Sequence, residues 1–340
     1  MKKNKWIIGA GILALLLVGT GIAGAVLFLN HPFKVAKPTY VYIDKDDTRD
    51  SVYAKLEHDL HASTLRGFKM LVSLSNSREV HPGAYRFDAG DNTLSAFRRV
   101  RGGLQTPVKL TIPHVRTVGK LLHVVSRQLM ADSASLAALL ADSAYCARLG
   151  YNAETLPALF IPNTYEVYWT ITPDDFVKRM QKEHDLFWNA ARKEQARRIG
   201  FTPVEVTTLA SIVEEETADQ AEKPLIAGLY INRLHAGMPL QADPTVKFGL
   251  QQFALRRILH EHLLSDSPYN TYKHTGLPPG PICIPSVKGI ESVLNYTHHD
   301  YLYMCAKEDF SGTHNFAATF AEHQANARRY RQALDQRNIH

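Results

Sequence analysis

The chain has 340 residues, of which 45% are hydrophobic and 21% are charged. This composition is typical of a globular protein and excludes a disordered or fibrous chain. The formal net charge is +6, but the lysines and arginines are scattered and no basic run alternates with aromatic residues. No nucleic-acid partner is expected, because a nucleic-acid groove gathers such residues on one surface.

The amino-terminal segment contains a charge-free run, residues 7–29, that follows Lys2, Lys3 and Lys5. At about 1.5 Å per residue, a helix of this length crosses a hydrocarbon core about 30 Å thick. A cleaved signal peptide is the alternative, since residues 23–25 (AGA) fit a processing site. The apolar run continues beyond that site, which favours an uncleaved single membrane helix. Lys34 and Lys37 partly balance the terminal lysines, but the cluster at the very terminus favours an orientation with the amino end inside and the remaining chain outside.

Cysteine and histidine spacing predicts no metal and no other cofactor. Cys146, Cys283 and Cys305 are far apart and form no C-x-x-C motif, so neither a zinc module nor a disulfide framework is indicated. One pair could still bridge in an oxidising compartment. The histidine clusters at residues 260–262 and 298–300 lack the H-E-x-x-H spacing that directs two ligands from one helix face.

The segment after the charge-free run predicts a small α+β module. A linker and strand are expected within residues 35–45, and a second strand over 84–87 follows the turn His81-Pro82-Gly83. Helical periodicity lies between and after the strands, over residues 50–60, 64–72 and 94–100, the last capped by Asn92-Thr93 and ended by Gly102-Gly103. The order strand, helix, helix, strand fits a LysM-like module, although any α+β domain could have it.

The middle of the chain continues this alternation of elements. The pattern predicts a strand over 108–112, helices over 121–129 and 133–140, a cleft-lining loop or strand over 159–170, and one long polar helix from Pro173 to about Arg198.

The strongest helix start in the chain is Thr202-Pro203, with Glu205 as the capping-box partner. An apolar stripe follows at helical spacing, and its next member is an acid, Glu216. The stripe consists of Val206, Leu209, Ile212 and Val213. Glu216 is therefore expected on the buried face, whereas Glu214 and Glu215 are expected on other, more solvated sides of the helix.

A carboxyl group against an apolar wall has a raised pKa, because burial disfavours its charged form, and it can act as a general acid near neutral pH. The alternative is a structural acid that pairs with a cation, for which Arg233 is a candidate. A hydrolytic glycosidase needs a second carboxylate. Acids occur around Asp243 and Asp300, but no spacing fixes either of them relative to Glu216. One acid without a clear twin fits a lytic transglycosylase better than a hydrolase. In that reaction the 6-hydroxyl of N-acetylmuramic acid closes onto its own C1, so a single glutamate can serve as acid and base: it protonates the leaving oxygen and takes up the hydroxyl proton.

Five ordered blocks resemble the MltG (YceG-like) family of endolytic murein transglycosylases. They are LASIVEEET (209–217), YINRL with GMPLQADPTV (230–234, 237–246), SPYNTY (267–272), GLPPGPI (276–282), and YLY with HNF (301–303, 314–316). Upstream, LFIPNTY (159–165) and GAYRF (83–87) are similar to further family motifs. The first of these has one extra residue and Asn163 where the family usually has aspartate. Residues 113–116 (PHVR) replace a stretch that usually holds an acid and glycine.

The resemblance implies an α+β fold with an N-terminal transmembrane helix, a small LysM-like subdomain and a larger α+β catalytic domain. The expected divisions are residues 1–37 for the tip, anchor and linker, 38–105 for the LysM-like subdomain, 106–200 for the connecting part and 201–340 for the catalytic domain. It also implies that Glu216, the second glutamate of E-x-E-T, is the catalytic acid. Polar residues of the family blocks are candidate glycan contacts or scaffold residues: Gln241, Asp243, Thr245, Asn270, Tyr272, His314 and Asn315.

The implied substrate is the glycan strand of nascent peptidoglycan, cut near the membrane to give 1,6-anhydro ends and to limit strand length. Peptidoglycan synthases are a further class of expected partner. Two alternatives remain open from the sequence, a hydrolytic muramidase and a non-catalytic peptidoglycan-binding scaffold.

Overall fold

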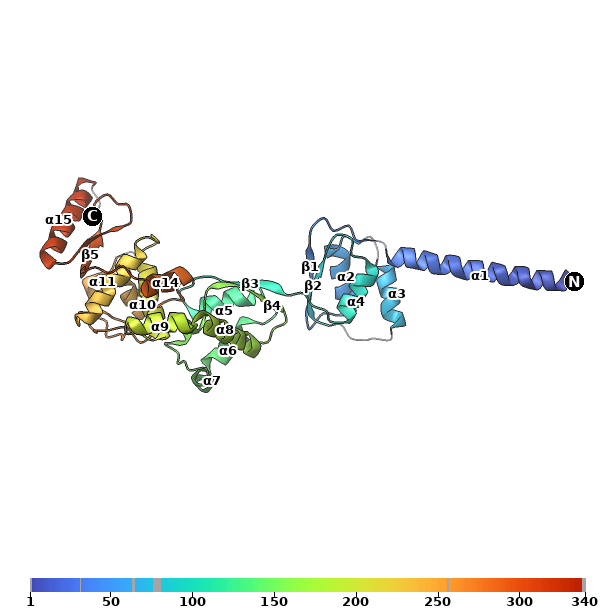
Figure 1. Ribbon diagram of the computed structural model, residues 1–340, viewed down its shortest axis with the longest axis horizontal. Helices are drawn as coiled ribbons and strands as arrows, with labels where there is room; N and C mark the ends of the chain where they lie inside the picture. Colours follow the sequence, from blue (N-terminus) through green and yellow to red (C-terminus); the bar gives the residue numbers. More distant parts are fainter. Residues whose placement is uncertain (1, 31, 63–64, 76–80, 256, 338–340) are drawn as a thin grey trace. The chain divides into compact units, whose positions relative to one another are not determined.

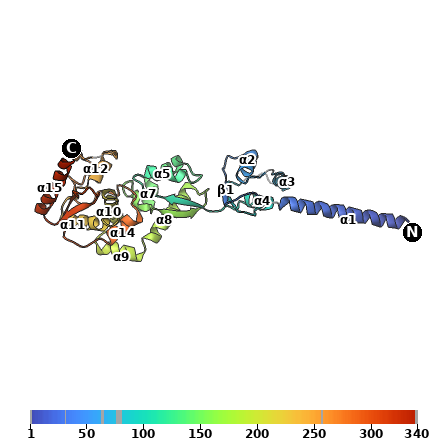
Figure 2. The same ribbon diagram turned by 90° about the horizontal axis from the view of Figure 1, so that it is seen from above.

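A computed structural model describes residues 2–30, 32–62, 65–75, 81–255 and 257–337, without the side chains of residues 2–10 and 27. The chain forms two compact units (Figures 1 and 2). Unit 1 comprises residues 1–110 and 166–171, and unit 2 comprises residues 111–165 and 172–340. The structure is a mixed α+β fold of helices and two-stranded sheets, as expected.

Unit 1 confirms the predicted order of strand, helix, helix and strand. Its elements are α1 (Lys2–Leu29), β1 (Thr39–Ile43), α2 (Arg49–Asp59), α3 (Arg66–Leu74), β2 (Gly83–Phe87) and α4 (Thr93–Arg101). Strands β1 and β2 pair antiparallel, with Val41 opposite Tyr85. Both side chains are fully buried in one apolar core. Asn92 caps α4 by accepting a hydrogen bond from the Ser95 amide at 2.9 Å, as its sequence position predicted.

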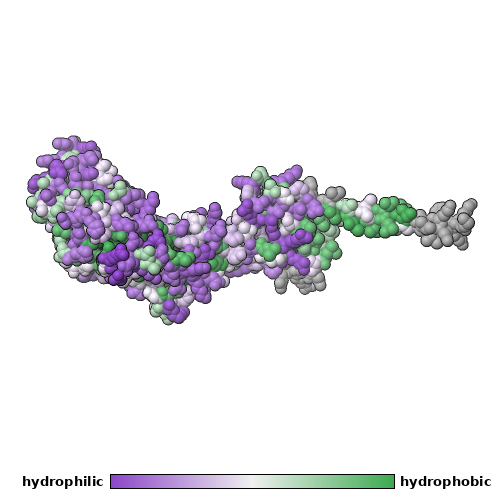
Figure 3. All heavy atoms as spheres, in the orientation of Figure 1, coloured by the Kyte–Doolittle hydropathy of each residue, from purple (hydrophilic) through white to green (hydrophobic). Residues whose placement is uncertain are grey.

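Helix α1 contains the run that was expected to span a membrane. Its described apolar side chains are exposed, for example Leu15 at 74% (Figure 3). Within the part of α1 and of the other helices that the structure describes, none is both long and apolar enough to cross a membrane. The expected membrane span is therefore not confirmed.

The first part of unit 2 is mostly helical. It contains α5 (Val118–Ser126), α6 (Ser133–Ala141), α7 (Ser143–Arg148), the 3-10 turn η1 (Leu156–Leu159), α8 (Pro173–Phe187) and α9 (Ala190–Arg198). Strands β3 (Val108–Ile112) and β4 (Asn163–Val167) form a two-stranded sheet, and each crosses the division between the units.

The prediction of one long helix over residues 173–198 is wrong, because the helix is interrupted between α8 and α9. Trp188 leaves helical geometry with ψ of 57°, and its ring is buried with 1% of its surface exposed. Asn189 then starts a new helix by accepting a hydrogen bond from the Arg192 amide at 3.0 Å. Burial of the Trp188 ring and the Asn189 cap together stabilise the interruption more than a continuous helix would be stabilised here.

The second part of unit 2 is built around α10 (Pro203–Glu216), which is buried among other helices. These are α11 (Lys223–His235), α12 (Asp243–Gly249), α13 (His260–Leu263) and α14 (Val287–Leu294), followed by β5 (Tyr303–Ala306), β6 (His314–Ala317) and α15 (Phe320–Gln336). Helix α10 packs against α11, α12 and α14, and α15 packs against the β5–β6 hairpin (Figure 1). The predicted capping box is present, since Thr202 and Glu205 each bond the other's amide. The predicted stripe is fully buried, with 0% exposure at Val206, Leu209, Ile212 and Val213.

The proline- and glycine-rich segment before α14 is held close to another part of unit 2. A Cβ atom on Gly280 would lie 2.1 Å from the backbone oxygen of Glu154. Only glycine fits there without moving the main chain. This contact gives a physical reason for a glycine at position 280 of the G-L-P-P-G block.

Gly280→Ala is expected to lower the free energy of unfolding by about 1–3 kcal/mol, because the added methyl group overpacks a main-chain contact. Gly119→Ala is the matched control, since its Cβ would meet no atom closer than 4.0 Å. Urea unfolding of both variants measures the difference. Equal stabilities would show that the segment moves aside without cost.

Candidate active site

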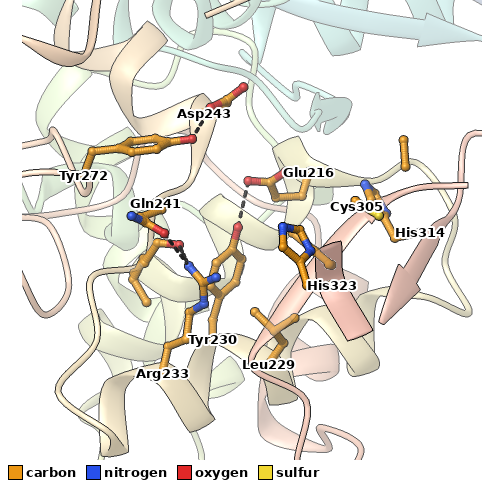
Figure 4. Close-up of a pocket in the computed structure, with 13 residues that line it drawn as sticks. Glu216, Leu229, Tyr230, Arg233, Gln241, Asp243, Tyr272, Cys305, His314 and His323 are labelled. Carbon is orange, nitrogen blue, oxygen red and sulfur yellow. Dashed lines mark hydrogen bonds between the residues drawn. The ribbon is translucent and has the colours of Figure 1, made fainter. Parts of the chain in front are cut away.

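A cavity of about 310 Å³ opens at the carboxyl end of α10 and is lined mainly by polar residues (Figure 4). Glu216 is the last residue of α10 and lies in its wall. Helix α11 contributes Tyr230 and Arg233. The other walls come from the start of α12 and the residues before it, from the segment between α13 and α14, from the β5–β6 hairpin and from α15. They include Gln241, Asp243, Tyr272, Cys305, His314 and His323.

The carboxyl group of Glu216 has a neutral hydrogen-bond partner. The phenol of Tyr230 donates to Oε1 of Glu216 at 2.8 Å. Burial raises the pKa of Glu216 to about 7, although the Tyr230 hydrogen bond lowers it and the charge of Asp243 raises it. The carboxyl end of a helix also disfavours a negative charge. Glu216 can therefore hold a proton near neutral pH and release it to a group in the cavity.

Arg233 does not neutralise this acid, since no ion pair joins the two among the described residues. Its guanidinium donates instead to the backbone oxygens of Leu302 at 2.6 Å and Leu240 at 2.8 Å. It also donates to Oε1 of Gln241 at 3.4 Å. Arg233 thus stabilises the cavity wall by linking the segments that contain Leu240 and Leu302.

Glu214 and Glu215 are not solvated as expected, because cations from distant segments neutralise both. Glu214 pairs with the buried Lys223 at 2.8 Å. Glu215 pairs with Arg116 at 2.7 Å and lies 3.6 Å from His114. Burial alone would raise the pKa of Glu215, but the hydrogen bonds from His114 and Arg116 bring it below its ordinary value. Of the three consecutive acids, Glu216 has a raised pKa and faces the cavity.

One group of described residues could supply three metal ligands: His114, Glu215 and Cys283 have donor atoms within 4.8 Å of one another. Arg116 already balances the charge of Glu215. Burial raises the pKa of the Cys283 thiol, which disfavours the thiolate that a metal would bind. The carboxylate of this cluster is therefore already paired, in an ion-pair network of Glu215 with Arg116 and His114 beside α10.

The predicted site residues divide into two groups. Gln241, Asp243, Tyr272 and His314 line the cavity with Glu216. The phenol of Tyr272 donates to Asp243 at 2.6 Å, so these two side chains form one polar wall (Figure 4).

Thr245, Asn270 and Asn315 do not line the cavity. Thr245 and Thr271 share a buried hydrogen bond of 2.8 Å. Asn270 donates to the backbone oxygens of Leu263 and Ser265 and so fixes a turn. Asn315 donates to Glu308.

The buried threonines fix Gln241, whose backbone has a left-handed φ of 53°. The backbone N–H of Gln241 donates to the backbone oxygen of Thr271 at 3.0 Å, and the backbone N–H of Ala242 donates to the Thr271 hydroxyl at 3.0 Å. Non-glycine residues in this conformation are uncommon and need such support. Thr245 and Thr271 thus act beneath the cavity.

Sequence reasoning missed Tyr230, Glu222 and His323 as parts of this region. Tyr230 stands in the Y-I-N-R-L block, and its position on the face of α11 toward α10 was the available signal. Glu222 stands outside the cavity and accepts hydrogen bonds from His314. No local pattern distinguished it from other polar residues of its segment.

The fold and the cavity define an α+β protein with one buried, protonatable acid at a polar site. A sequence model described as the YceG-like family matches residues 41–329. The chain therefore belongs to the YceG-like family.

Several relatives carry the name endolytic murein transglycosylase. The protein from Bacillus subtilis (strain 168) is 36% identical over 157 residues, 46% of this chain and 42% of the relative. The protein from Streptococcus pneumoniae (strain ATCC BAA-255 / R6) is 29% identical over 274 residues, 70% of this chain and 49% of the relative. The chain thus spans less than half the length of either relative. A crystal structure of a YceG-like protein from Listeria monocytogenes is similar with a TM-score of 0.58 and 25% identity, covering 86% of this chain and 99% of that chain.

Glu216→Gln is expected to leave the free energy of unfolding unchanged near pH 4 and to raise it at about pH 8, by up to about 3 kcal/mol. The carboxyl group of Glu216 has a pKa of 4.5 in the unfolded chain and about 7 in the folded protein. The folded wild type therefore binds the extra proton in between and loses stability as pH rises through this window, whereas glutamine stays neutral. Urea unfolding at both pH values tests this, with the exposed Glu194→Gln as control. An equal effect at both pH values would contradict the raised pKa.

Proposed function

We propose that this protein is a lytic transglycosylase that cleaves the glycan strands of peptidoglycan, with Glu216 as its acid. The observation that carries the proposal is a carboxyl group with a pKa raised by burial to about 7 that faces a polar cavity. The relatives named endolytic murein transglycosylase support the same reaction and substrate. Cleavage within nascent strands would end their elongation.

The proposed reaction breaks the bond between C1 of N-acetylmuramic acid and O4 of N-acetylglucosamine. Glu216 gives its proton to the leaving O4. The 6-hydroxyl of the same muramic residue closes onto C1 and yields a 1,6-anhydro end. A general acid must be protonated at the working pH and lie within hydrogen-bond reach of the leaving oxygen. The raised pKa of Glu216 meets the first requirement, and its place in the cavity wall supports the second.

Glu216→Gln is expected to reduce cleavage of purified peptidoglycan by at least about 100-fold, because the amide keeps the shape but cannot transfer a proton. Binding of peptidoglycan should persist. Mass analysis of the digest counts 1,6-anhydro ends, and Glu194→Gln on the exposed α9 is the control. Cleavage by Glu216→Gln at the wild-type rate would exclude Glu216 as the acid. Binding without cleavage by the wild type would instead favour the scaffold alternative.

Hydrolysis is the second candidate, and Asp243 is the observation that favours it. Asp243 lines the same cavity and could serve as the second carboxylate that activates water. Hydrolysis would leave reducing ends instead of anhydro ends. Our proposal predicts anhydro ends from both the wild type and Asp243→Asn. Reducing ends from the wild type that disappear in Asp243→Asn would establish a muramidase.

We further propose that residues 7–29 anchor the chain in the inner membrane, with the LysM-like module and the catalytic domain facing the periplasm. The charge-free run behind three lysines supports this location. Near the membrane, peptidoglycan synthases would be its neighbours. The full chain is expected in the membrane fraction of cells, and a chain that begins at Pro38 is expected in the soluble fraction. Recovery of both chains in the soluble fraction would argue against the anchor.

A further inference from the structure

His314 is held in the cavity by a buried carboxylate. Glu222, with 6% of its surface exposed, accepts the backbone N–H of His314 at 2.6 Å and lies 2.9 Å from its Nδ1. A carboxylate oxygen accepts hydrogen bonds, so we assign the hydrogen of this contact to Nδ1. In the neutral ring this leaves the lone pair on Nε2.

The two contacts fix both the main chain and the ring of His314. Glu222 directly precedes α11, where the amino end of a helix favours a negative charge. His314 begins β6 and pairs with Ala306 of β5. The ring therefore has one tautomer and one position before any ligand binds.

Nε2 of His314 is available for chemistry. No hydrogen bond to this atom is found within the described ranges, and His314 lines the cavity that also contains Glu216 (Figure 4). A carboxylate that bonds one ring nitrogen while the other faces a substrate is the arrangement that orients a general base.

We propose that His314 is the base of the reaction and that Glu222 is its positioning residue, an inference that rests on the proposed transglycosylase function. Nε2 takes the proton of the 6-hydroxyl while O6 forms its bond to C1. The bond between C1 and O4 breaks, and O4 takes the proton of Glu216. The cavity is left with a glutamate anion and an imidazolium cation. Transfer of one proton back to Glu216 through water restores the starting state.

A separate acid and base suit this cavity better than one carboxyl group that serves in both roles. A single carboxyl group would have to give up its proton before it could accept another, whereas an acid and a base can act in the same step. Tyr230 occupies Oε1 of Glu216, so Oε2 is the oxygen free to carry the proton. The other charged or titratable groups around the cavity are Arg233, Asp243, Tyr272, Cys305 and His323.

The test uses the full chain in detergent and measures kcat and KM between pH 5 and 8. The wild-type rate should fall at low pH as the base becomes protonated. His314→Gln should lower kcat by about 10²–10⁴-fold and lose this acid limb. Imidazole added to His314→Ala should restore part of the rate. Glu222→Gln should lower kcat less, with little change in KM, because the second ring tautomer becomes populated.

Glu308→Gln is the control, because Glu308 lies between β5 and β6 and contacts Asn315 and Arg329 outside the cavity. It should retain the wild-type profile. A raised KM with unchanged kcat in His314→Gln would make His314 a substrate contact and overturn the proposal. If His314→Gln does not fold, the absence of an acid limb in the wild type would overturn it. A wild type that makes no anhydro ends would instead refute the transglycosylase function itself.

Discussion

The site depends on the burial of one carboxyl group at the end of a buried helix. The apolar stripe of α10 directs Glu216 inward, and the helix ends there. Its bonded partner is the neutral phenol of Tyr230, not a cation. Burial therefore keeps the proton on the acid, whereas a close guanidinium would have removed it. Arg233 lines the same cavity, but the backbone oxygens of Leu240 and Leu302 bind its donors.

Three adjacent glutamates thus have two different roles. Glu214 and Glu215 bind cations from α11 and from the segment after β3, and both ion pairs fasten α10 to its neighbours. The pair of Glu214 and Lys223 is buried, and such a pair adds little net stability but is costly to break. These pairs therefore define the position of α10 and hence the direction in which Glu216 points.

Much of this arrangement follows from local sequence signals. The Thr202 cap and the apolar stripe predict α10 and the inward direction of Glu216, because caps and periodicity act within one helix. The strand, helix, helix and strand order of unit 1 follows for the same reason. The end of α8 was missed, since periodicity runs through Trp188 and only tertiary burial of its ring explains the break.

Contacts between distant segments could not be predicted in this way. The partners of Glu215, the hold of Glu222 on His314 and the phenol that bonds Glu216 all join residues far apart in sequence. The family blocks point to polar residues of this region as a group but could not separate cavity walls from supports. Thr245, in the first turn of α12, and Asn270, in the segment after α13, donate to backbone oxygens instead of facing the cavity.

The cavity takes its walls from segments that leave the ribosome at very different times. Glu216 and Tyr230 are synthesised long before the β5–β6 hairpin that brings His314. The helical core can form first, but its acid then faces an incomplete site. The cavity would therefore be enclosed only in the final stage of folding, when the hairpin docks. A nascent or proteolytically shortened chain without the hairpin would keep Glu216 and lack this enclosure.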